Sequence, residues 1–203
     1  MKKLSSRQAE IIELTKQLFS ELGYQETSMR LIAQRLDIKA ASLYSHFESK
    51  DHILKIICDE FHDSLENIMV KMKEVEKTED GLFLFIHLYI SAVNSMGSGL
   101  SLYHKYYMNI DEKFGNRYSE MNTRFYDFIR NMFEEAFPNF VEKPFYKKDT
   151  TILFFIGTLN NIQRYINFEN PDTDRIAKDL YERWLYGFKK DMNPNYVNNF
   201  KVK

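Results

Sequence analysis

The segment from residue 27 to residue 50, TSMRLIAQRLDIKAASLYSHFESK, constrains the fold more than any other part of the chain. It holds two short runs in which the apolar residues recur every three or four positions, which places them on one face of a short helix. These residues are Met29, Ile32, Ala33 and Leu36 in the first run, and Ala40, Leu43, Tyr44 and Phe47 in the second. Asp37 and Ile38 lie between the runs, so the segment predicts a helix-turn-helix.

The second run carries residue types that contact DNA from a recognition helix. In a helix-turn-helix the second helix enters the major groove, while the first crosses the backbone. The leading end of the second run includes Lys39, Ala40 and Ser42. Lysine supplies positive charge, the methyl group of alanine can meet a thymine methyl, and a serine hydroxyl can bond to a base edge or a phosphate. Tyr44 and His46 follow on the polar side, within reach of phosphates.

A further helix is predicted to begin directly after this motif. Ser49 is a suitable N-cap, because a serine hydroxyl accepts a hydrogen bond from a backbone amide of the first helical turn. The free amides at a helix N-terminus attract anions. Lys50 beside them therefore predicts a phosphate clamp.

The first fifty residues resemble the DNA-binding domain of TetR-family transcriptional regulators. The resemblance rests on a helix over residues 6–22, the residues Gly23-Tyr24 and Thr27, the two short helices, and the run Leu43-Tyr44-x-His46-Phe47-x-x-Lys50. It implies core roles for Leu43 and Phe47. It also implies DNA-facing roles for eight residues: Thr27, Ser28, Lys39, Ala40, Ser42, Tyr44, His46 and Lys50.

Two positions depart from the family's pattern. Asp37 stands at the turn where the family usually has glycine. That position favours a positive φ, which aspartate tolerates better than most residues. Lys39 stands where the family often has a serine or threonine that caps the recognition helix, and the missing cap costs about 1 kcal/mol. Because a carboxylate repels phosphate, we expect Asp37 to point away from DNA.

The rest of the chain is predicted to be helical. The 203 residues include only seven glycines and four prolines, and no long stretch alternates apolar and polar residues as an edge strand would. Apolar spacing and breaking residues predict helices over residues 6–22, 50–75, 80–96, 100–109, 111–137, 148–168 and 172–191. We therefore predict an all-α fold. It would comprise a helix-turn-helix DNA-binding domain over residues 1–50 and a helical ligand-binding and dimerisation domain over residues 51–203.

The last two predicted helices resemble the dimerisation pair of the same family. Two such helices from each partner would form a four-helix interface with two-fold symmetry. The predicted interface residues are Phe155, Leu159, Ile162, Leu180, Trp184 and Phe188. The same apolar faces could instead fill the core of the monomer, and each helix has apolar residues on more than one side. A dimer suits DNA binding, because two recognition helices match half-sites separated by whole helical turns.

Aromatic residues gather in the middle of the chain, with polar groups among them. A small-molecule site needs an apolar pocket with a few converging polar groups. The candidate lining residues are Phe83, His87, Tyr89, Tyr103, His104, Tyr107, Phe125, Phe128 and Asn160. The plainer interpretation is an aromatic core with surface histidines. The resemblance favours a pocket for an inducer, and the aromatic and methionine content favours an apolar or aromatic effector.

The mechanism expected for such a protein is a shift between two conformations of a homodimer. The free dimer would hold its recognition helices at the spacing of a palindromic operator, and an effector that prefers another spacing would release the DNA. The helix over residues 50–75 would act as the lever. The resemblance to the family implies a repressor. The alternative is a DNA-binding regulator or architectural protein with no small-molecule ligand.

Composition fits a regulator better than a general nucleic-acid coat protein. The net charge is −1, and residues 1–50 hold eight Lys and Arg against six Asp and Glu, whereas the remainder holds 20 against 23. This weak asymmetry favours a basic contact face on the first part. The single cysteine, Cys58, argues against a disulfide scaffold and lies in an apolar run that favours buried packing. With no signal peptide and no apolar run of about 18 residues, we expect a soluble, cytoplasmic protein without a membrane partner.

No pattern of catalytic or metal-binding residues favours an enzyme. Glu60 and His62 are two positions apart, so on a helix they point to different sides, and two histidines four apart with a glutamate between them do not occur. A nucleophile elbow, a phosphate-binding glycine loop and a Cys-x-x-Cys pair are also missing from the sequence. We therefore expect no catalytic residue, no metal and no cofactor.

Overall fold

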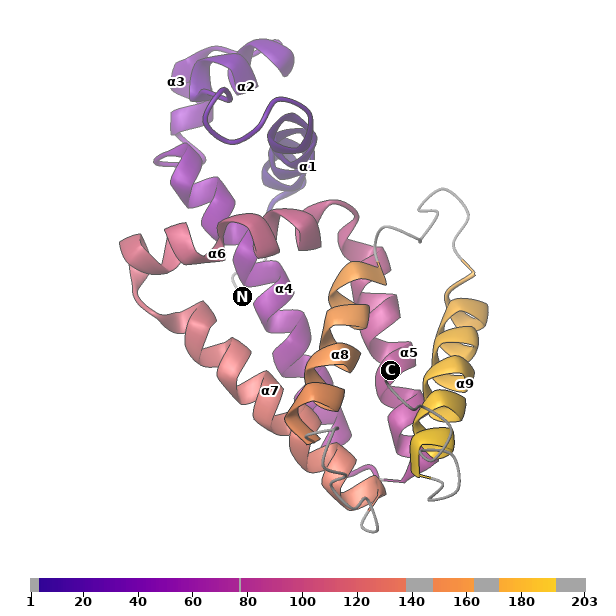
Figure 1. Ribbon diagram of the computed structural model, residues 1–203. Coiled ribbons are helices and arrows are strands. Elements are labelled where there is room, and N and C mark those ends of the chain that lie inside the picture. The colour runs from indigo at the N-terminus through magenta and orange to yellow at the C-terminus, as the bar shows by residue number, and fades with distance from the viewer. Residues whose placement is uncertain (1–3, 77, 138–147, 163–171, 193–203) are drawn as a thin grey trace, which may run out of the picture. The chain divides into compact units, whose positions relative to one another are not determined.

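The computed structural model describes residues 4–76, 78–137, 148–162 and 172–192, including their side chains apart from those of residues 148–151 and 186–192. The described part is built of helices without strands, which confirms the predicted all-α class (Figure 1). The helices are α1 Ser6–Glu21, α2 Met29–Arg35, α3 Ala40–Tyr44, α4 Lys50–Met72, α5 Glu79–Met96, α6 Gly99–Phe114, α7 Arg117–Ala136, α8 Lys148–Asn161 and α9 Thr173–Met192.

The chain divides into two compact units. The first comprises residues 1–64 and 96–121, and the second comprises residues 65–95 and 122–203. The first unit therefore holds α1, α2, α3 and α6 with the beginning of α4, and the second holds α8 and α9 with most of α5 and α7. Each unit is a group of residues in mutual contact, so the division does not test where one function ends and another begins. The functional boundary predicted at residue 50 stays a prediction.

The first unit is organised around buried apolar residues of its short helices. A capping box begins α1, in which the Ser5 hydroxyl accepts from the Gln8 amide and the Gln8 side chain accepts from the Ser5 amide. After α1, Gly23 turns the chain with a φ of 87°, a value that favours glycine. The buried core residues between the start of α1 and the middle of α4 include Ile11, Leu18, Phe19, Ile32, Ala33, Leu43, Phe47, Ile53, Ile57 and Phe61.

The turn between α2 and α3 has the geometry that the sequence predicts. Asp37 adopts a φ of 52°, in the left-handed region where the family usually has glycine. Lys39 precedes α3 and makes no side-chain capping hydrogen bond. Ser49 precedes α4, and its hydroxyl accepts a hydrogen bond from the His52 amide at 3.1 Å, which confirms the predicted cap.

The predicted break between two helices at residue 110 is wrong. Helix α6 continues to Phe114, and the chain turns at Gly115, which has a φ of 95°. The break lies there because the buried carboxylate of Asp111 reaches forward and caps α7. It accepts hydrogen bonds from the amides of Tyr118 at 2.9 Å and Ser119 at 2.8 Å. A residue expected to begin the next helix therefore caps that helix from within the preceding one.

Removing this cap is expected to destabilise the first unit. We predict that Asp111→Ala lowers the free energy of unfolding by about 1–2 kcal/mol, because two amides at the start of α7 lose their acceptor. Urea denaturation measures the change. Glu112→Ala is the matched control, since the Glu112 side chain is exposed, and it should leave the stability near that of the wild type. Equal losses in both variants would contradict the capping role of Asp111.

The second unit packs α5, α7, α8 and α9 around aromatic side chains. Tyr89 of α5 stacks on Phe125 of α7, with 6.0 Å between the ring centroids. Phe155 of α8 lies 5.1 Å from Phe133 of α7 and 5.1 Å from Trp184 of α9, both in edge-on geometry. The aromatic residues of the middle of the chain thus supply much of this core.

None of the described helices is by itself both long and apolar enough to cross a membrane, and α5 and α6 meet that test only when taken together as a bent pair.

Candidate nucleic-acid interface and effector site

The exposed face of α3 is held outward by two core residues. Leu43 is fully buried and Phe47 is almost so, which confirms the core roles implied by the resemblance. On the opposite side, Tyr44 is 55% exposed, and the side chains of Lys39, Ala41 and Ser42 are exposed as well. Buried anchors and exposed side chains are therefore separated on opposite sides of α3 and the residues that flank it, as a recognition helix requires.

The remaining polar candidates lie beside this face with different degrees of exposure. Ser28 is exposed, and its hydroxyl caps α2 by accepting a hydrogen bond from the Leu31 amide at 3.1 Å. Ala40 and His46 are half-buried. Arg30, on the exposed side of the first turn of α2, was not among the predicted residues. A basic side chain on the polar face of the first helix of the motif is the sequence feature that would have indicated a phosphate contact at this position.

The side chain of Thr27 points into the protein. It is fully buried, and its hydroxyl donates to the carbonyl oxygen of Gly23 at 2.8 Å. The side chain therefore fastens the turn between α1 and α2 and is not available to DNA. Sequence spacing placed Thr27 beside the interface but did not show which way its hydroxyl points.

Lys50 also makes its contacts within the protein. Its ammonium group donates to the carbonyl oxygens of Tyr24 at 2.8 Å, Thr27 at 3.0 Å and Gln25 at 3.3 Å. The same ammonium lies 4.3 Å from the centroid of the Tyr24 ring, which is a cation–π contact. Burial lowers the pKa of Lys50, and the nearby Lys113 lowers it further.

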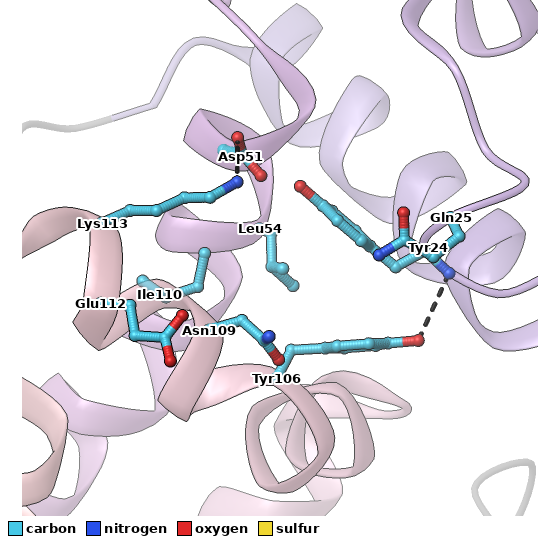
Figure 2. A pocket seen from close by; sticks show the side chains of 9 residues that line it. All are labelled: Tyr24, Gln25, Asp51, Leu54, Tyr106, Asn109, Ile110, Glu112 and Lys113. Atoms are coloured by element: carbon cyan, nitrogen blue, oxygen red, sulfur yellow. Dashed lines mark hydrogen bonds and ion pairs between the residues drawn. The ribbon is translucent and has the colours of Figure 1, made fainter.

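A cavity of about 100 Å³ lies beside this turn, in the first unit. Figure 2 shows the residues that line it, which come from the turn after α1, the start of α4, and α6: Tyr24, Gln25, Asp51, Leu54, Tyr106, Asn109, Ile110, Glu112 and Lys113. An ion pair of 2.7 Å joins Lys113 to Asp51. The cavity is smaller than the 300–1,000 Å³ that drug-sized ligands occupy, so it does not correspond to the effector pocket predicted from the aromatic residues.

The predicted effector residues fall into both units. In the second unit, the buried Tyr89 donates to the Asn160 side chain at 3.0 Å, His87 pairs with Asp174 at 2.6 Å, and the cluster also includes Phe83, Phe125 and Phe128. Tyr103, His104 and Tyr107 lie in the first unit, where Tyr103 packs between Phe61 and Tyr107. Burial lowers the pKa of His104 to about 4, so this histidine is neutral at pH 7.

Several of the residues predicted for a dimer interface are buried in the core of the second unit, and their role in a dimer stays a prediction. Phe155 and Leu159 are fully buried, and Ile162 is 8% exposed. Leu180 and Trp184 of α9 are half-buried, and the side chain of Phe188 lies outside the described residues. The sequence analysis did not select Leu153 and Phe154 of α8, which are 59% and 74% exposed. Apolar spacing alone did not distinguish the two sides of α8.

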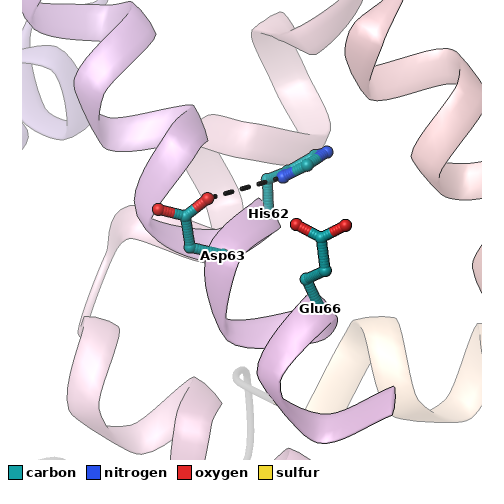
Figure 3. Close-up of side chains that lie close together, drawn as sticks. All are labelled: His62, Asp63 and Glu66. Atoms are coloured by element: carbon teal, nitrogen blue, oxygen red, sulfur yellow. Dashed lines mark ion pairs between the residues drawn. The ribbon is translucent and has the colours of Figure 1, made fainter. Parts of the chain in front are cut away.

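Three side chains of α4 form the kind of cluster that can hold a metal ion. Figure 3 shows His62, Asp63 and Glu66, whose ligand atoms lie within 4.8 Å of one another. The guanidinium group of Arg117 already lies 3.2 Å from Nδ1 of His62 and donates to Asp63 at 3.3 Å. Arg117 at the start of α7 therefore already engages two of the three side chains in this cluster, His62 and Asp63.

Cys58 is fully buried among the apolar residues of α4, which confirms its predicted packing role. Burial raises the pKa of its thiol to about 12, so almost no reactive thiolate exists at neutral pH.

Residues 11–57 match the family model of bacterial regulatory proteins, tetR family. Over 127 residues the chain is 28% identical to the HTH-type transcriptional repressor KstR2 of Rhodococcus jostii, covering 60% of both chains. Over 81 residues it is 38% identical to IcaR of Staphylococcus aureus, the negative transcriptional regulator of the biofilm operon icaADBC, covering 39% of this chain and 44% of that one. The chain thus spans 60% or less of the length of these curated relatives.

Solved structures share the fold over nearly the whole chain. The ketosteroid transcriptional regulator KstR2 of Mycobacterium tuberculosis superposes with a TM-score of 0.80 at 19% identity, covering 91% of this chain and 96% of that one. PfmR of Thermus thermophilus, a TetR-family regulator, superposes with a TM-score of 0.73 at 21% identity, covering 87% and 97%. The helix-turn-helix of α2 and α3 therefore lies in a segment, residues 11–57, that belongs to the tetR family of bacterial regulatory proteins, and the chain shares the fold of these solved transcriptional regulators.

Proposed function

We propose that the protein is a DNA-binding transcriptional repressor that works in the cytoplasm as a homodimer and releases its operator when it binds a small effector. The observation that carries this proposal is the exposed face of α3, held outward by the buried Leu43 and Phe47 within the segment that matches the family. Repression follows the names of the relatives in Rhodococcus jostii and Staphylococcus aureus, a repressor and a negative regulator.

Direct contacts to DNA are assigned to the exposed residues of this face. Ser42 and Tyr44 lie where base edges and adjacent phosphates would come within reach, and Lys39 supplies positive charge at the start of α3. Ala40 and His46 lie at the margin of the face. Ser28 and Arg30, at the start of α2, are assigned to phosphates, because the first helix of the motif crosses the backbone. Residues 1–50 form the proposed DNA-binding domain.

The dimer is assigned to the outward side of α8. Leu153 and Phe154 are large apolar side chains exposed next to each other, and such a patch on a soluble protein marks an interaction site. Two copies related by a two-fold axis would bury this patch against itself. The same axis would present two recognition helices to a palindromic operator.

The effector site is assigned to the second unit, near Tyr89, Phe125 and Asn160. The hydrogen bond from Tyr89 to Asn160 places a polar pair within an aromatic core, which is the combination that recognises an apolar ligand bearing one or two polar groups. The relative from Mycobacterium tuberculosis is a ketosteroid regulator, whereas IcaR controls a biofilm operon. We therefore propose a small apolar or aromatic molecule as the effector and name no particular compound.

The DNA-binding part of this proposal is tested by selection from random duplex DNA. The purified protein should enrich a sequence whose two halves are related by two-fold symmetry, and a Tyr44→Ala variant should enrich none. Tyr126→Ala, a half-buried tyrosine of α7 in the second unit, is the matched control and should enrich the same sequence as the wild type. Recovery of unrelated sequences by the wild type would contradict the proposal.

A further inference from the structure

The hydroxyl group of Tyr24 is buried beside the cavity of the first unit without a hydrogen-bond partner. Tyr24 is 8% exposed, and its hydroxyl oxygen, which is shielded from solvent, pairs with no group among the described residues. Buried hydroxyl groups are normally paired, so this exception requires an explanation. Figure 2 shows the hydroxyl directed toward the end of the cavity where Asp51 and Lys113 lie. The cavity therefore has one buried polar group that is free to bind a ligand.

The cavity combines an apolar wall with a polar end. Leu54 of α4 and Ile110 of α6 line it, and each is only 1% exposed. At the polar end, Asp51 and Lys113 are joined to each other by their ion pair of 2.7 Å. A ligand would thus find an apolar surface for its carbon atoms and the unpaired Tyr24 hydroxyl for a polar group. This is the combination that small-molecule sites require.

The volume of the cavity limits a ligand to a few non-hydrogen atoms. The cavity measures about 100 Å³, whereas a water molecule needs about 10–15 Å³ and a cavity of about 150 Å³ binds the six carbon atoms of benzene. By this comparison it accommodates about four or five non-hydrogen atoms. The exposed side chains of Gln25, Asn109 and Glu112 also belong to the lining, so a ligand can enter from solvent.

The charges around the cavity favour an uncharged ligand. Asp51 and Glu112 contribute two carboxylates, and Lys113 contributes an ammonium group. A second ammonium group, that of Lys50, lies 4.3 Å from the centroid of the Tyr24 ring. The formal charges of these four groups cancel, so neither an anion nor a cation would be matched by a net opposite charge. A hydroxyl or amide group can instead bond to the Tyr24 hydroxyl and leave the ion pair intact.

We propose that this cavity is a small-molecule site, separate from the effector site assigned to the second unit, for an uncharged molecule of about four or five non-hydrogen atoms that carries an amide or hydroxyl group on a short apolar chain. The Tyr24 hydroxyl binds the polar group, and Leu54 and Ile110 contact the chain. The inference does not depend on the proposed function, because binding at this site is a property of the protein without DNA.

The site is tested by nuclear magnetic resonance titration with three compounds that share a three-carbon chain. Propionamide is uncharged, propionate is an anion and propylammonium is a cation. We expect millimolar propionamide to shift the methyl signals of Leu54 and Ile110 saturably, and to bind about tenfold more tightly than either charged compound, because a charged group loses hydration without gaining an opposite charge. No saturable shift with propionamide, or equal or tighter binding of a charged compound, would overturn the proposal.

Tyr24→Phe removes the hydroxyl and keeps the ring, so it isolates the proposed contact. Propionamide should bind about three- to tenfold more weakly to this variant, which is the effect of losing one hydrogen bond. The free energy of unfolding should not fall, because the hydroxyl has no partner to lose among the described residues. Tyr107→Phe is the matched control, since Tyr107 lies on α6 but does not line the cavity, and it should bind propionamide as the wild type does.

Two results with Tyr24→Phe would overturn the proposal. Unchanged affinity for propionamide would show that the hydroxyl does not recognise the ligand. A clear loss of stability would show that the hydroxyl is already paired within the protein. Urea denaturation of both tyrosine variants measures this second quantity separately from binding.

Discussion

Replacing Phe155 by alanine is expected to lower the free energy of unfolding of the second unit by about 3–5 kcal/mol. Phe155 is fully buried, and its ring contacts Phe133 of α7, Trp184 of α9 and Phe85 of α5. Alanine would leave a cavity among side chains from four helices, which cannot close without moving those helices. Urea denaturation followed by tryptophan fluorescence reports the loss directly, because Trp184 packs on the altered position.

Phe154→Ala is the matched control for this substitution. The neighbouring residue is of the same type and lies in the same helix, but its side chain is 74% exposed. We expect little change in the stability of the monomer, and a weaker dimer if the outward side of α8 is the interface. Sedimentation at two protein concentrations separates the two effects. Equal losses of monomer stability in both variants would contradict the orientation of α8.

Removing the carboxylates around Lys16 is expected to have an effect of similar size. Lys16 of α1 is only 2% exposed, and its ammonium group pairs with Glu13 at 2.7 Å and with Glu60 of α4 at 2.8 Å. A buried charge without a partner costs about 3–5 kcal/mol. We therefore predict a loss of this order in the double variant Glu13→Gln with Glu60→Gln, measured by urea denaturation.

Lys16→Met is the control that identifies the cause. Methionine has a similar length and no charge, so adding Lys16→Met to the double variant should restore most of the lost stability. Lys16→Met alone should lie near the wild type. If the triple variant is as unstable as the double variant, the loss comes from the glutamates themselves and not from an unpaired ammonium.

The same ion pairs predict how stability depends on pH. Burial opposes the charge on Lys16, but Glu13 and Glu60 outweigh it and raise the pKa above its usual 10.5. The protonated form is therefore favoured by folding. The contribution of this group to stability is complete below pH 10.5 and is lost as the pH rises through the folded-state pKa. Above neutral pH, the stability difference between wild type and Lys16→Met should therefore change in that alkaline range.

The sequence predicted those parts of the structure that depend on local chemistry. The positive φ of Asp37, the missing cap at Lys39, the Ser49 cap and the burial of Leu43 and Phe47 all follow from residue type and spacing within a few positions. Helix propensity and apolar spacing act over the same short range. For this reason the helix-turn-helix and the all-α class were recognisable before the structure.

The parts that the sequence did not predict depend on contacts between distant residues. Lys50 binds carbonyls some 25 positions earlier, and only the folded chain brings them together. Asp111 lies within α6 and caps α7 through its side chain, whose direction the spacing of residues does not reveal. On α8, Phe154 and Phe155 are identical in type, and the packing of α5, α7 and α9 alone decides which of them is buried.

The proposed function depends above all on sequence-specific DNA binding by the exposed face of α3. The most direct test is a titration of the protein onto its selected duplex and onto a scrambled duplex of equal length, followed by fluorescence anisotropy at several salt concentrations. We expect tight binding to the selected duplex that weakens steeply with salt, and a loss of preference over the scrambled duplex in Tyr44→Ala. Equal affinity of the wild type for both duplexes, unchanged in Tyr44→Ala, would contradict it.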